Sequence, residues 1–212
     1  MIRRLPPIPA IALGIALPIL LALPLGATLV LELNLAQLKE RAATIVHGRC
    51  IAKREVPDGQ PLPYTEYTFE VKKALRGCQD TQGKPLERIT VRHAGTSQAE
   101  TRGDGLEAAP RRWGIPEHQV GEEAILFLTK ESSLGLCAPV GLDQGKLEVV
   151  QKDGRKLAIN KRGKRLFESL DSKKFQTLNA AETAALESPG DALDLDCFLG
   201  LCAKLAPELK AE

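Results

Sequence analysis

The sequence lacks the local motifs by which common catalytic and metal-binding sites are recognised. It contains no Gly-x-Ser-x-Gly element and no His-x-Glu, His-x3-His or Cys-x2-Cys spacing. Gly103-Asp104-Gly105 has neither the further glycines nor the Lys-Ser/Thr pair of a phosphate-binding loop, so we interpret it as a turn. The sequence therefore predicts no catalytic residue, no bound metal and no cofactor, and we do not expect an enzyme.

Histidines and acidic residues are also few or poorly placed for metal binding. His47, His93 and His118 are irregularly spaced, and we expect His47 and His93 to be partly exposed residues of strands. The aspartates within residues 191–196 do not fill the positions of a calcium loop, and they are better interpreted as the cap and solvated start of a helix. The basic run at 161–165 suggests either an anionic partner or, as we favour, a solvated turn.

The N-terminus is the most informative segment for localisation. Two arginines precede residues 8–31, which carry no charge. Signal peptides usually hold an apolar stretch of about 7 to 15 residues, whereas a membrane span needs about 20. Pro18 and Pro24 interrupt the stretch and Ala27 offers a small residue for cleavage, which favours a signal peptide over residues 1–27. The alternative is an uncleaved inner-membrane anchor. In both cases we expect the rest of the chain to lie outside the cytoplasm, in the periplasm or beyond the cell.

The mature chain lacks net charge. Without residues 1–27, 185 of the 212 residues remain, which is the length of one domain. This removal takes away two arginines and no acidic residue, so the formal charge falls from +2 to zero. A neutral chain gives no electrostatic reason to expect a nucleic-acid partner.

Cysteine is present in an odd number, so one thiol would stay unpaired in an oxidising compartment. We expect this to be Cys50, which lies among apolar residues of a strand. Cys78 and Cys137 both lie near strand ends and could form a disulfide bond. Cys197 and Cys202 are five residues apart in an expected helix and would point in different directions. The connectivity stays open.

Hydrophobic periodicity predicts a mainly β (α+β) chain. Strands are expected at 29–34, 45–53, 64–75, 89–93, 123–129, 146–151 and 155–160. Helices are expected at 35–43, weakly at 175–187, and around 195–202. Asn34 would cap the first helix, and either Asp191 or Asp194 the last. Asp153-Gly154 predicts a tight hairpin, the segment 53–63 predicts a turn, and Pro139 restricts residues 136–140 to an edge or irregular strand.

Several short motifs resemble those of uncharacterised exported bacterial proteins. The motifs lie at residues 43–49, 67–71, 75–77, 120–123, 126–128 and 140–146. Such proteins are similar to the netrin/tissue-inhibitor-of-metalloproteinase type of OB-fold domain. The resemblance covers about residues 29–167 and implies a five-stranded closed barrel with a helix packed beside it. Inhibitors of that type use a cysteine at the mature N-terminus. Here the expected mature N-terminus is Thr28 and no cysteine precedes Cys50, so no inhibitory residue is carried over.

The expected organisation is thus a signal peptide or anchor (1–27), a small OB-like β-barrel (28–167) and a helical C-terminal extension packed on it (168–212). Residues 94–121 form a long connection without periodicity, which is typical of a binding loop. It contains Arg111, Arg112 and Trp113, the only tryptophan, and these three residues are the candidate binding site.

Three functions remain open. The first is a non-enzymatic exported domain that binds a protein or a cell-envelope polymer through this loop. The second is an exported hydrolase or protease-associated accessory protein whose residues meet only in the folded chain. The third is a membrane-anchored envelope assembly factor, which requires that residues 1–27 be retained.

Overall fold

The structure is a computed structural model that describes residues 31–57, 62–97, 100–101, 107–108, 114–159, 163–170 and 172–205. Residues 32–212 form one unit. The segment on which the signal-peptide and anchor predictions rest lies outside the described residues. Within the described ranges, no helix has both the length and the apolar character needed to cross a membrane.

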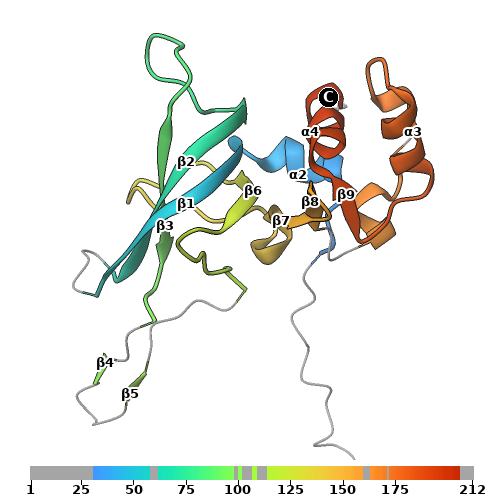
Figure 1. The fold of residues 1–212 in the computed structure, drawn as a ribbon. Coiled ribbons are helices and arrows are strands. Elements are labelled where there is room, and N and C mark those ends of the chain that lie inside the picture. The colour runs from blue at the N-terminus through green and yellow to red at the C-terminus, as the bar shows by residue number, and fades with distance from the viewer. Residues whose placement is uncertain are drawn as a thin grey trace, which may run out of the picture. The chain divides into compact units, whose positions relative to one another are not determined.

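Seven antiparallel strands form one sheet in the order β3-β2-β1-β6-β7-β8-β9 (Figure 1). The strands are β1 (Thr44–Val56), β2 (Tyr64–Arg76), β3 (Arg88–Ala94), β6 (Glu123–Leu128), β7 (Lys146–Lys152), β8 (Arg155–Ile159) and β9 (Ala192–Asp194). A separate two-stranded ladder joins β4 (Glu100–Thr101) and β5 (Glu107–Ala108). The prediction of a mainly β chain is therefore confirmed.

The sheet is not closed into a barrel, contrary to our expectation. Its outer strands are β3 and β9, and β7 to β9 extend the sheet beyond β6. Residues 136–140, expected to be an edge or irregular strand, form an isolated bridge between Pro139 and Leu128. Their backbone hydrogen bonds include those from Val140 to Phe127 (2.7 Å), from Thr129 to Ala138 (2.9 Å) and from Cys137 to Arg92 in β3 (2.9 Å). Proline has no N–H group to donate, so a regular ladder cannot continue through residue 139.

Within the described residues, three α-helices and three short 3-10 helices accompany the sheet. They are α2 (Leu35–Arg41), α3 (Ala180–Glu187), α4 (Leu195–Lys204), η1 (Leu142–Gly145), η2 (Gly163–Phe167) and η3 (Ser172–Lys174). Asn34 caps α2 through a reciprocal capping box with Gln37, as predicted, and Asp194, one of the two candidates for the last helix, caps α4. The expected strand at 29–34 is wrong for its described residues, because Asn34 serves as the cap and the Leu33 N–H donates to the Gln144 side chain instead of a strand.

Turn chemistry places the hairpin between β7 and β8. Asp153 and Gly154 both have positive φ values, of 51° and 76°, as the tight turn requires. The other expected turn begins later than predicted: β1 continues through Val56, where its last residues still pair with β2. An ion pair of 2.8 Å between Arg54 and Glu66 spans this polar extension. Cross-strand charge pairing therefore supports a ladder that hydrophobic periodicity alone did not reveal.

The two faces of the sheet pack against two separate clusters of apolar residues. On one face, Ile45, Ile125 and Phe127 pack with α2 and α4. On the other face, β1 to β3 and β6 enclose a second cluster that includes Tyr67 and Phe69. β6 contributes to both clusters and is buried along its whole length, which agrees with its continuous apolar sequence.

All five cysteines are free thiols in the structure, and four of them are buried. Cys50 lies in the second cluster, as its apolar surroundings predicted, and its Sγ contacts the Ala52 carbonyl at 3.5 Å. Cys78 and Cys137 belong to the same cluster, where burial raises the pKa of each thiol. A disulfide bond between these two residues stays a prediction.

Candidate functional site

The binding residues predicted from the sequence, Arg111, Arg112 and Trp113, lie outside the described residues, as do the turn at 103–105 and the first half of the basic run at 161–165. The candidate site described here is a different one. It lies on the sheet face that packs against α4, where the apolar residues of that face are followed along the strands by charged residues.

Strand register brings the charged residues of this site together. Arg49 of β1 lies directly opposite Glu123 of β6, and His47 is two residues away on the same face of β1. Lys73 of β2 lies opposite His47. Glu123 pairs with Val149 of β7, and Val149 pairs in turn with Ala158 of β8. Lys156 lies two residues before Ala158 on the same strand. The same register that aligns apolar residues in the core therefore aligns charged residues at its edge.

Glu123 is the centre of this cluster. Its side chain is 8% exposed, and its Oε1 accepts a hydrogen bond of 2.7 Å from Nε2 of His47. Nζ of Lys156 lies 2.6 Å from Oε1 and 2.9 Å from Oε2. Nη2 of Arg49 lies 3.5 Å from the same Oε2. The side chains of Arg49 and Lys156 are 50% and 42% exposed, so one buried carboxylate fixes two half-exposed cations beside each other.

The protonation states follow from burial and neighbouring charge. Burial alone would raise the pKa of Glu123, but the hydrogen bonds from Lys156 and His47 outweigh it and the pKa is lowered, so the carboxylate is ionised at neutral pH. Burial lowers the pKa of His47, against the opposing effect of Glu123, and this favours the neutral imidazole. Because an ionised carboxylate only accepts hydrogen bonds, Nε2 of His47 carries the hydrogen and Nδ1 is an acceptor.

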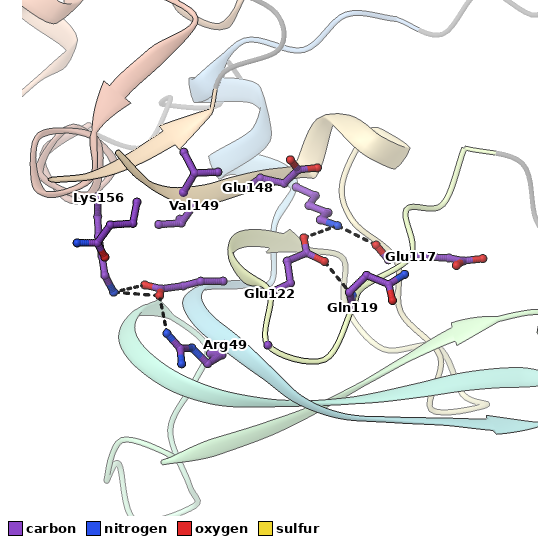
Figure 2. Close-up of a pocket in the computed structure, with 12 residues that line it drawn as sticks. Arg49, Glu117, Gln119, Glu122, Glu148, Val149 and Lys156 are labelled. Atoms are coloured by element: carbon purple, nitrogen blue, oxygen red, sulfur yellow. Dashed lines mark hydrogen bonds and ion pairs between the residues drawn. The ribbon is translucent and has the colours of Figure 1, made fainter. Parts of the chain in front are cut away.

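The two cations open into a pocket of about 530 Å³, which we call the Arg49 pocket. Figure 2 shows Arg49 and Lys156 at one end and Glu117 and Gln119 at the other. Val149 and Val150 add apolar surface. The volume lies within the range of about 300 to 1,000 Å³ typical of small-ligand sites.

A second ion pair stiffens the far wall of the Arg49 pocket. Nζ of Lys146, whose side chain is only 9% exposed, lies 2.6 Å from Glu122 and donates a hydrogen bond of 2.8 Å to the Glu117 carbonyl. Glu122 in turn accepts a hydrogen bond of 2.9 Å from the Gln119 N–H. These contacts tie residues 117–122 to the start of β7 and fix the shape of the pocket.

Lys156 also lines a second pocket, of about 470 Å³, which we call the Lys73 pocket. Its wall includes His47, Lys72, Lys73 and Arg155 on the strands and the first residues of α4. The Glu123–Lys156 pair therefore stands between two concave surfaces.

Histidine burial is where the sequence prediction is wrong. His47 and His93 are buried, rather than partly exposed on strands, and His118, for which no exposure was predicted, is buried as well. The His93 and His118 rings lie 5.3 Å apart between centroids and pack edge-on against Tyr67. Among the described residues, no ring nitrogen of either histidine has a hydrogen-bond partner. Apolar neighbours brought by β2 and the 114–121 segment cause this burial, which strand periodicity in β3 alone does not indicate.

Only part of the site was visible in the sequence. Polar residues at 47 and 49 continue the alternation that begins with buried Ile45, and Glu122 precedes β6, whose first residue is Glu123. These were signals of a strand end with charged residues on the core-facing side. Lys73 is on β2 and Lys156 is on β8, and only the order of the strands in the sheet brings these residues near Arg49 and Glu123.

The described residues contain no group of three or more His, Cys, Asp or Glu residues arranged to hold a metal ion. Comparison with known proteins finds no protein family, no curated protein and no solved structure that matches the chain.

Proposed function

We propose that this chain is an exported, non-enzymatic binding domain that holds an anionic group of its ligand between Arg49 and Lys156. The observation that carries the proposal is the contact of two half-exposed cations with one oxygen of the buried Glu123. At this end of the pocket one carboxylate charge faces two cationic groups, while Glu117, Glu122, Lys146 and Glu148 line the rest of it. Holding both side chains in place in advance reduces the entropy that binding would otherwise lose.

Arginine suits this role because its planar guanidinium can donate two parallel hydrogen bonds to a carboxylate, phosphate or sulfate. In the described residues, Arg49 has no ion pair other than the 3.5 Å contact with Glu123. Arg49 lines the pocket, and half of its side-chain surface is exposed. The ligand we propose is a protein or cell-envelope polymer that carries such a group.

Titration of the protein with inorganic phosphate, followed residue by residue by NMR, tests this site. We expect saturable shift changes at Arg49, Glu123 and Lys156, and a loss of affinity of at least about tenfold when Arg49→Ala and Lys156→Ala are combined. Arg92→Ala is the matched control, since Arg92 is also half exposed and bound to a carboxylate, Glu66. Equal binding by the double variant and the control would overturn the assignment.

We propose that the long connection at 94–121 also contacts the ligand of the Arg49 pocket. Its described end, residues 117–121, contributes to the wall of the Arg49 pocket. Changing Arg111, Arg112 and Trp113 together to alanine should weaken binding of a macromolecular ligand while leaving phosphate binding unchanged. If the triple variant binds both as the wild type does, the loop has no part in recognition.

A hydrolase is the second candidate function, and one observation favours it. The Glu123-bound imidazole of His47 presents an acceptor nitrogen, Nδ1, as a general base requires. However, neither the Arg49 pocket nor the Lys73 pocket has a serine, threonine or cysteine among the described residues that line it. Such an enzyme would have to activate water directly, so a loss of hydrolysis in His47→Gln is the result that would favour it.

The resemblance to the netrin/tissue-inhibitor-of-metalloproteinase type of OB-fold domain also stays a proposal, here with a sheet that is not closed into a barrel. Two contacts support a partial closure: the Leu128–Pro139 bridge and the hydrogen bond from Cys137 to Arg92 connect β6 to β3 through residues 137–139. Export, and the alternative of a membrane-anchored assembly factor, rest on residues 1–27 alone.

A further inference from the structure

The Lys73 pocket is lined by more positive than negative charge. Four cationic residues of the strands and hairpin line it: Lys72, Lys73, Arg155 and Lys156. The acidic residues on its wall are Asp194 and Asp196, at the start of α4. Asp194 is already engaged, because its Oδ1 accepts the N–H groups of Asp196 and Cys197 as the helix cap.

A bulge in the β1–β2 ladder concentrates the lysines. The register shifts between His47 and Gly48, so that Lys73 pairs with His47, Val71 pairs with Gly48, and Lys72 has no opposite residue. Both lysines are exposed. Lys72 contacts Glu70 at 2.6 Å, whereas the structure gives Lys73 and Arg155 no carboxylate partner among the described residues. Two cations of this pocket are therefore not neutralised by a contact within the described chain.

We infer that the Lys73 pocket is a second anion-binding subsite, and that the ligand is a linear polyanion with repeated phosphate or sulfate groups that contacts both pockets. This inference rests on the proposed function of the Arg49 pocket. Lys156 connects the two pockets, since it lines both and is held in place by its ion pair with Glu123. Arg49 and Lys156 line one pocket, and Lys156, Lys73 and Arg155 line the other, which suits a chain of charges better than one isolated anion.

Linking two subsites through one ligand makes the second contact intramolecular, and affinity then exceeds that of either contact alone by about 10² to 10⁴. A polyanion should therefore bind far more tightly than its single repeating group. Salt should weaken the long ligand more steeply, because more exposed charge pairs are screened.

The test compares inorganic phosphate with long-chain polyphosphate, using calorimetry and the full chain. We expect polyphosphate to bind at least about a hundredfold more tightly per chain than phosphate. Combining Lys73→Ala with Arg155→Ala should remove most of this gain while leaving phosphate binding at the Arg49 pocket within about twofold of wild type. Lys84→Ala with Arg92→Ala is the matched control, because it removes the same two charges from exposed positions around β3.

Each outcome separates the two proposals. If the Lys73/Arg155 variant binds polyphosphate as the control does, or if chain length has no effect, the second subsite is overturned, and phosphate binding that depends on Arg49 leaves the proposed function in place. If neither probe binds the wild type, both proposals fail. Replacing polyphosphate with a sulfated polysaccharide distinguishes a phosphate-bearing from a sulfate-bearing ligand.

Discussion

Histidine is buried in two regions of this protein, and the regions differ in whether the imidazole has a partner. His47 is 5% exposed and bonded to Glu123 at 2.7 Å, at the edge of the sheet face that carries the charged site. His93 and His118 are 3% and 0% exposed, in the second core cluster, and their ring nitrogens lack partners among the described residues. A paired buried histidine can orient other side chains. An unpaired one fills space and is tolerated only while it is neutral.

Acidification should distinguish the two regions most strongly. Burial lowers the pKa of His93 to about 4, with Lys146 acting in the same direction and the nearby Pro116 carbonyl opposing it. Burial, Lys146 and His93 lower the pKa of His118 to about 2. Since both pKa values lie below the unfolded value of 6.5, the unfolded chain binds more protons as the pH falls below about 6.5. Stability is therefore present above that pH and is lost below it.

We expect the free energy of unfolding to fall by roughly 2 kcal/mol for each of these two histidines between about pH 7 and about pH 5. Urea unfolding of the wild type and of a His93→Leu/His118→Leu variant measures this, because leucine keeps the volume and removes the titration. The variant should keep only the weaker dependence left by His47, whose pKa is also lowered. The same slope in both proteins would show that the pair does not stay neutral in the fold.

Glu123→Gln should have the next largest effect, because it keeps the side-chain shape and removes the charge to which Lys156 and Arg49 bind. We expect a loss of about 1 to 2 kcal/mol in the free energy of unfolding at neutral pH, modest because both cations can turn to solvent. Glu66→Gln is the matched control: Glu66 also joins two arginines, Arg54 and Arg92, but is 15% exposed. A loss no larger than that of the control would mean that Glu123 is not an organising residue.

His47→Gln should have the smallest effect, and it tests the comparison directly. The glutamine amide can still donate a hydrogen bond to Glu123, so we expect a loss below about 1 kcal/mol in urea unfolding near pH 7. His93→Gln places the same amide where the imidazole has no partner, and should lose more. Equal losses at the two positions would remove the distinction between the paired and the unpaired site.

Local sequence signals determined the elements whose structure depends on neighbours along the chain. The cap at Asn34 and the Asp153-Gly154 hairpin were predicted, and Asp194 was one of two candidates for the last cap, because capping and turn formation need only a few adjacent residues. The apolar sequence of β6 likewise indicated a central strand, and the structure buries it on both faces. Pro139 indicated an irregular strand, since a missing N–H is a property of one residue.

Tertiary structure decided what depends on residues far apart in the sequence. Closure of the barrel was predicted and is not found, because β7 to β9 extend the sheet beyond β6, and strand order is set by packing that no local pattern encodes. The charged site combines β1, β6 and β8, so the sequence did not indicate that Arg49, Glu123 and Lys156 would meet. The burial of His93 and His118 depends on β2, whose Tyr67 and Phe69 contact these rings, and on the 114–121 segment that brings His118 against His93. A sequence specifies which residues can pair; only the register of distant strands determines which charges share a buried counter-ion.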